Sequence, residues 1–95
     1  MQTDNKKLQD NKQKVIIVLG KIINKYRIKN NLSLNLLANQ LQTSKTVISL
    51  IEKGQKDPQF TTLWRICEGL NIPFSELVTE VKKEFPEDFN LSDLE

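Results

Sequence analysis

A chain of 95 residues with 38% hydrophobic residues is long enough for one domain with a small core. It has no histidine and one cysteine, Cys67, so an internal disulfide is excluded and the commonest general base and metal ligand is missing. No apolar run approaches the roughly 20 residues of a membrane span, and the polar N-terminal end predicts no signal peptide. These features predict a cytoplasmic binding protein that is not an enzyme and needs no cofactor or metal.

The net charge of +2 conceals an uneven distribution of charge along the chain. Residues 1–56 contain eleven Lys and Arg against three Asp and Glu, whereas residues 57–95 contain three against nine. One end of the molecule is therefore expected to face a polyanion that the other end repels. A lysine-rich solvated surface is the alternative explanation of the same counts.

The N-terminal part of the chain changes character after its first fourteen residues. Residues 1–14 have almost no apolar side chains and predict a flexible polar arm or a frayed helical extension. Residues 15–30 have apolar side chains on one face at helical spacing and predict the first helix. Asn30 and Asn31 are expected to end it, because asparagine adopts the left-handed conformation more readily than other non-glycine residues.

Two short helices separated by a tight turn are predicted in the middle of the chain. Residues 34–41 have apolar side chains at 3.6-residue spacing, and a second apolar face begins after Ser44 and ends at Ile51. A serine precedes each helix and is expected to cap its N-terminus. The small side chain of Ala38 opposite Ile48 would let the helices cross closely, at the steep angle of a helix-turn-helix.

Two further helices and a tail follow. Residues 60–70 predict a fourth helix with these side chains facing the core or its edge: Phe60, Leu63, Trp64, Ile66, Cys67 and Leu70. Residues 74–84 predict a fifth helix that buries Phe74, Leu77, Val78 and Val81. The folded domain is therefore assigned to residues 15–84. Residues 85–95 alternate acids with large apolar residues, which predicts a tail that folds back or contacts a second subunit, in preference to a separate protein partner.

The middle of the chain contains a set of spaced residues and short motifs: Ala38, Gln42, Ile48, Ile51, the run Ile-Glu-Lys-Gly at 51–54, and Pro-x-Phe-x-x-Leu from Pro58. This set resembles the Cro/repressor-type (xenobiotic-response-element-like) helix-turn-helix family, over residues 19–78. The resemblance implies an all-α, five-helix, lambda-repressor-like DNA-binding domain. One departure is Gln42, where the family usually has glycine; a left-handed glutamine costs about 1 kcal/mol.

The resemblance also implies roles for individual residues. The third helix would lie in the major groove, where its N-terminal residues meet base edges. The base-contact candidates are Lys45, Thr46, Ser49 and Leu50. The phosphate-contact candidates are Leu34 through its backbone amide, Thr43, Ser44, Lys53 and Lys56. Arg27 and Glu52 correspond to a family ion pair that braces the first helix against the third; two independent surface charges are the alternative.

The function implied is a sequence-specific transcriptional regulator, either a repressor or a small controller-type activator, that binds a palindromic double-stranded DNA operator. A homodimer formed through the fifth helix and the tail is expected, because the third helix must stay free for the groove. Such a protein would be nucleoid-associated when bound. A protein-interaction module or antitoxin on the same scaffold is the alternative, since Leu34 and Leu50 replace residues that are often polar in the family. The remaining lysines favour DNA.

Overall fold

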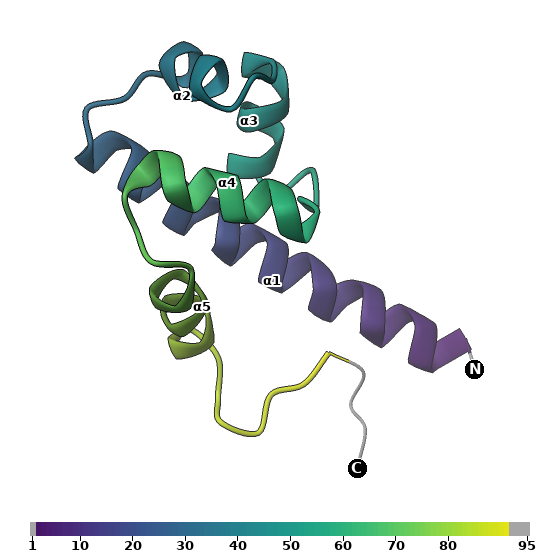
Figure 1. Cartoon of the computed structure of the whole chain (residues 1–95). Helices are drawn as coiled ribbons and strands as arrows, with labels where there is room; N and C mark the ends of the chain where they lie inside the picture. The colour runs from purple at the N-terminus through teal and green to yellow at the C-terminus, as the bar shows by residue number, and fades with distance from the viewer. Residues whose placement is uncertain (1, 92–95) are drawn as a thin grey trace.

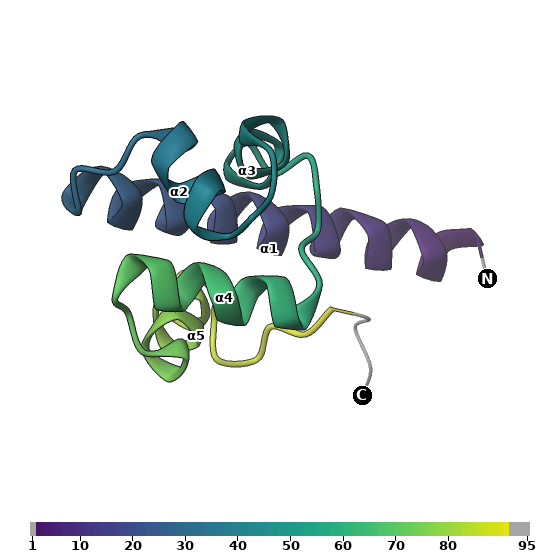
Figure 2. The same cartoon turned by 45° about the horizontal axis from the view of Figure 1, so that its top comes forward.

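The structure is a computed structural model that describes residues 2–91, with side chains from Lys6 onward. Five helices and no strand lie within that range: α1 Gln2–Lys29, α2 Leu34–Gln40, α3 Lys45–Glu52, α4 Phe60–Leu70 and α5 Phe74–Lys83. The long α1 crosses the molecule, with α2 and α3 on one side and α4 and α5 on the other (Figures 1 and 2). The predicted all-α, five-helix fold is confirmed. No helix in residues 2–91 is both long and apolar enough to span a bilayer.

All five helices contribute to one hydrophobic core. Its fully buried large side chains are Ile23, Leu37, Ile48, Ile51, Ile66, Leu70 and Leu77. Each contributes about 1.5–3 kcal/mol by leaving water. Ala38 is also buried, so the expected close crossing of α2 and α3 is present. Among the predicted core residues, Leu63 is only partly buried, because it packs at the edge of the core.

Serine caps and a left-handed residue set the ends of the two short helices α2 and α3. The Ser33 hydroxyl accepts a hydrogen bond from the Leu36 amide at 3.0 Å, which caps α2. The Ser44 hydroxyl accepts from the Val47 amide at 3.2 Å, which caps α3. Between them Gln42 is left-handed with φ 55°, so the residue that departs from the family glycine still adopts the conformation glycine would favour.

Helix α1 approaches α3 closely at Gly20. A Cβ atom at this position would lie 2.4 Å from the Ile51 carbonyl oxygen and 2.6 Å from the Glu52 carbonyl oxygen. Neither oxygen can move aside, because both belong to the backbone of α3. A glycine is therefore required for α3 to pack against α1 at this distance.

Helix α1 begins at Gln2 rather than near residue 15, so residues 2–14, for which a flexible arm or a frayed helical extension was predicted, form its first half. Two polar side chains hold this part of the helix against distant backbone. The Asn11 amide donates to the carbonyl oxygens of Asn90 at 3.3 Å and Leu91 at 3.0 Å. The Gln13 amide donates to the Gly54 carbonyl oxygen at 2.7 Å. The hydrophobic pattern of the sequence does not predict this part of α1, because hydrogen bonds and not a stripe of apolar side chains hold it against the rest of the protein.

The tail folds back over residues 85–91 (Figure 1). The rings of Phe85 and Phe89 stack with centroids 4.4 Å apart and lie with Leu91 around a small apolar hollow beside Val15. Leu94, the last large apolar residue of the predicted tail, lies outside the described residues. The fold-back expected for the tail is therefore present as far as Leu91.

Three side chains expected in or at the edge of the core are exposed instead. Phe60 is 63% exposed, Trp64 50% and Val78 44%. Phe60 contacts Phe74 at a centroid distance of 5.0 Å, and Trp64 stacks on Phe74 at 5.5 Å. The prediction was wrong because the rings of Phe60 and Trp64 pack on each other and on Phe74 at the surface, where they stay in contact with solvent. On α5 the neighbouring Leu77 takes the buried position, and Val78 faces solvent. We call Phe60, Trp64, Phe74 and Val78 the aromatic surface.

Candidate nucleic-acid interface

One side of helix α3 is buried in the core, and its first turn is exposed to solvent. Ile48 and Ile51 are buried, whereas Lys45 and Thr46 at its first turn are exposed. Neither of these two side chains forms a hydrogen bond or ion pair with any residue from 2 to 91. The lysine ammonium can donate to guanine O6 and N7, and the threonine can offer a hydroxyl or a methyl group. The start of α3 therefore exposes an ammonium group and a hydroxyl group that are free to contact base edges.

The two remaining base-contact candidates lie further along α3. Ser49 and Leu50 are partly buried, so each offers a smaller surface than the residues of the first turn. Leu50 can contribute only apolar contact, which suits a thymine methyl group. The site thus combines one cation, two hydroxyls and one apolar side chain on one helix.

The phosphate-contact candidates surround α3 but differ in what they can offer. Lys53 at the C-cap and Lys56 in the following loop are exposed ammonium groups. Ser44 is exposed, and its oxygen already caps α3, so only its O–H remains for a phosphate. Thr43 is partly buried in the turn. Leu34, expected on the outer face, packs against the core instead, so it offers DNA only its backbone amide.

The Arg27 and Glu52 side chains form a bidentate pair. Arg27 Nε donates to Glu52 Oε2 at 2.6 Å and Nη2 donates to Oε1 at 3.1 Å. The carboxylate also accepts from Asn24 at 2.8 Å, and Arg27 Nη1 donates to the Leu32 carbonyl oxygen at 2.8 Å. The side chains are only 13% and 7% exposed. This network ties α1, the end of α3 and the start of α2 together, and so fixes the orientation of α3.

A second polar contact joins α1 to α5, away from α3 (Figure 1). The Tyr26 hydroxyl donates to Glu80, which also pairs with Lys25 at 3.0 Å. The hydrogen bond to Glu80, with burial and the nearby negative charge, raises the pKa of Tyr26 to about 12, and the same bond lowers the pKa of Glu80. Burial raises the pKa of the Cys67 thiol to about 11, so this thiol stays protonated at neutral pH and is no nucleophile.

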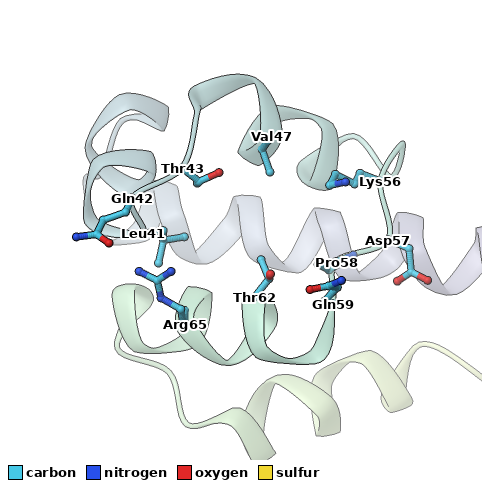
Figure 3. Close-up of a pocket in the computed structure, with 10 residues that line it drawn as sticks. All are labelled: Leu41, Gln42, Thr43, Val47, Lys56, Asp57, Pro58, Gln59, Thr62 and Arg65. Atoms are coloured by element: carbon cyan, nitrogen blue, oxygen red, sulfur yellow. The ribbon is translucent and has the colours of Figure 1, made fainter.

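Sequence reasoning missed a polar groove beside α3. It lies between the α2–α3 turn and α3 above and α4 below, and Val47 points into it from α3 (Figure 3). Thr62 and Arg65 of α4 face it together with Lys56 of the loop. No linear motif reveals this juxtaposition, because the residues lie on separate elements that only the tertiary fold brings together. We call this feature the α3–α4 groove.

A helix-turn-helix with unpaired polar side chains at the start of its second helix defines a DNA-binding protein. The comparison with known families agrees with this class. The model of the Helix-turn-helix family matches residues 23–77, and the chain belongs to that family. Its members among the relatives are regulators and not enzymes.

Two relatives are similar in sequence. The HTH-type transcriptional regulator SutR of Escherichia coli (strain K12) is 32% identical over 68 residues, 72% of this chain and 38% of its own length. Control protein C.MunI of Mycoplasma sp is 36% identical over 56 residues, 59% of this chain and 76% of its own length. The chain thus spans well under half of SutR but most of C.MunI.

One solved structure connects the fold to a controller protein. The wild-type restriction-modification controller protein C.Esp1396I superposes with a TM-score of 0.63 at 25% identity, over 73% of this chain and 95% of that chain. The same controller protein has been solved as a tetramer in complex with its natural 35 base-pair operator, with a TM-score of 0.62 at 24% identity.

Proposed function

We propose that this protein is a transcriptional regulator that binds a palindromic operator as a homodimer, with α3 in the major groove. The observation that carries the proposal is the split of α3 into a buried side and an exposed start. Ile48 and Ile51 fix the helix in the core, and Lys45 and Thr46 stay free for base edges. A recognition helix needs this combination of rigid placement and unpaired donors.

The residues take different roles in this proposal. The base contacts are Lys45, Thr46, Ser49 and Leu50, in the order of their exposure along α3. The backbone contacts are Lys53, Lys56, Thr43, Ser44 and the Leu34 amide. Phosphate contacts hold the register, and base contacts carry the sequence preference. The names of SutR and C.MunI support a regulatory or controller role, and C.Esp1396I supports operator binding by an oligomer.

The homodimer is proposed to form through the aromatic surface and α5, with the tail beside it. A largely apolar groove adjoins this surface, lined by Val15, Leu19, Leu63, Leu77, Val78, Val81 and Lys82. Because α3 lies on the opposite side of α1, such a dimer leaves both recognition helices free (Figure 2). The two helices would then meet half-sites about 34 Å apart, one turn of DNA.

The dimer can be tested by sedimentation with a substitution in the exposed ring. Trp64→Ala should shift the protein toward monomer without unfolding it, because the indole is half exposed. Leu36→Ala is the matched control, since Leu36 is an equally exposed apolar residue on α2. A wild-type protein that stays monomeric at high micromolar concentration, with and without operator, would refute the dimer.

The regulator itself is tested by selecting bound duplexes from a random pool and measuring their affinity at three salt concentrations. A DNA-binding protein shows a linear fall of log affinity with log salt, because each phosphate contact releases counterions. A protein-interaction module or antitoxin whose α3 binds protein would show no selected sequence and no such slope. That result would also revive the separate partner considered for the C-terminal tail. A cytoplasmic location, with the nucleoid when bound, follows from the regulatory role.

A further inference from the structure

The α3–α4 groove has the chemistry of an anion site, although no part of the sequence motif points to it. Lys56 and Arg65 contribute two positive charges, and Thr43 and Thr62 contribute hydroxyl groups that face the same space (Figure 3). One acid, Asp57, also lines the groove, so its net charge is positive by one. Guanidinium and hydroxyl donors converging on one space suit a phosphate group.

Arg65 carries the only guanidinium among the residues that line the groove. Its side chain is exposed and extends from α4 toward the α2–α3 turn, where Leu41 and Gln42 lie (Figure 3). It forms no ion pair or hydrogen bond with any residue from 2 to 91. The other arginine of the chain, Arg27, is fully occupied with Glu52 and the Leu32 carbonyl oxygen. Arg65 is therefore the only arginine among the described residues that remains available to an external anion.

We propose that the α3–α4 groove holds a phosphate of the operator strand that passes the start of α3, with Arg65 as its main cation and Thr62 as a hydrogen-bond donor. This inference rests on the proposed function and adds a backbone contact from α4. The position of the groove supports DNA as the source of the phosphate. Thr43 lines the groove two residues before Lys45, the first base-contact candidate, and Lys56 lines it from the loop. The groove therefore opens beside the start of α3, next to the strand that α3 would read.

The test measures operator and scrambled duplex affinities at three salt concentrations. Arg65→Gln should lower affinity for both duplexes about tenfold and reduce the salt slope by about one. Arg65→Lys should keep the slope, because it keeps the charge. Asp57→Asn should strengthen binding, because it removes the one negative charge of the groove. Lys21→Gln, which removes an exposed charge from α1, is the control and should leave the slope within error.

The outcomes separate this inference from the proposed function. If Arg65→Gln matches the Lys21→Gln control while Lys56→Ala still lowers the slope, the groove proposal fails and the regulator stands. If wild type shows no salt-dependent DNA binding, the proposed function fails first. A titration with inorganic phosphate, followed by amide NMR, tests the other source of the anion. Saturable shifts at Thr62 and Arg65 below millimolar phosphate, with DNA affinity indifferent to Arg65→Gln, would assign the groove to a free anion and overturn the proposal.

Discussion

The nearly buried pair between Arg27 and Glu52 allows a sharp prediction about stability. Arg27→Met keeps much of the side-chain volume and removes the guanidinium. The Glu52 carboxylate, 7% exposed, then keeps only its hydrogen bond from Asn24, and the Leu32 carbonyl oxygen loses a donor. Leaving a buried charge unpaired costs about 3–5 kcal/mol. That is a large share of the roughly 5–15 kcal/mol that stabilises a small domain.

Urea unfolding followed by far-ultraviolet circular dichroism measures this loss. With a slope of about 1–3 kcal/mol per molar urea, the midpoint should fall by roughly 2 M. Lys21→Met, an exposed lysine on the same helix, should change stability by less than about 0.5 kcal/mol. The double variant Arg27→Met with Glu52→Gln should recover at least about 2 kcal/mol of the loss, because no charge then remains buried. A double variant that loses the sum of the two single changes would refute the coupling.

Three smaller predictions concern particular contacts. The single tyrosine, Tyr26, should titrate near pH 12 by its ultraviolet absorbance, and Glu80→Gln should return its pKa toward 10. Since folding raises this pKa, the stabilisation from the contact is complete below pH 10 and disappears between about pH 10 and 12; a midpoint near 10 in the wild type would contradict it. Gly20→Ala should destabilise the protein by about 3 kcal/mol in urea unfolding, because its Cβ would press on the Ile51 carbonyl oxygen; an unchanged midpoint would show that α1 and α3 can separate freely. Ser44→Ala should cost about 1 kcal/mol through the lost cap of α3, and Ser44→Asn should restore most of it.

The two helices of the helix-turn-helix, α2 and α3, could be predicted from sequence because local and tertiary requirements coincide there. The serine caps, the spacing of Leu37, Ile48 and Ile51, and the left-handed residue at Gln42 all act within a few residues of one another. A segment whose local helix signals agree with its pattern of core residues can be predicted from sequence. The bounds of α3 follow directly from this agreement.

The two ends of the chain could not be predicted in the same way. Helix α1 extends to Gln2 because Asn11 and Gln13 reach carbonyl groups that lie far away in sequence. Phe60 and Trp64 have helical core spacing, yet both remain at the surface, where they pack on each other and on Phe74. Periodicity identifies which residues share a face, but it does not show whether another element covers that face.

The candidate interface could be predicted only in part from sequence, because some of its residues are brought together only by tertiary packing. Lys45 and Lys53 follow from their places at the two ends of one helix, which a motif fixes. Leu34 is correctly placed at the start of α2, but its side chain turns to the core. Arg65 lines the α3–α4 groove only through the packing of α4 against the α2–α3 turn, for which linear sequence has no signal.

The measurement that tests the account most directly compares Lys45→Ala with Lys56→Ala on a selected operator and on a scrambled duplex. Lys45 begins the recognition helix, and Lys56 lies in the loop beyond its far end. Lys45→Ala should cost about 1–3 kcal/mol on the operator and much less on the scrambled duplex. Lys56→Ala should weaken both duplexes by similar factors and reduce the salt slope by about one. A silent Lys45→Ala, or one that weakens both duplexes equally, would contradict the claim that α3 reads the sequence.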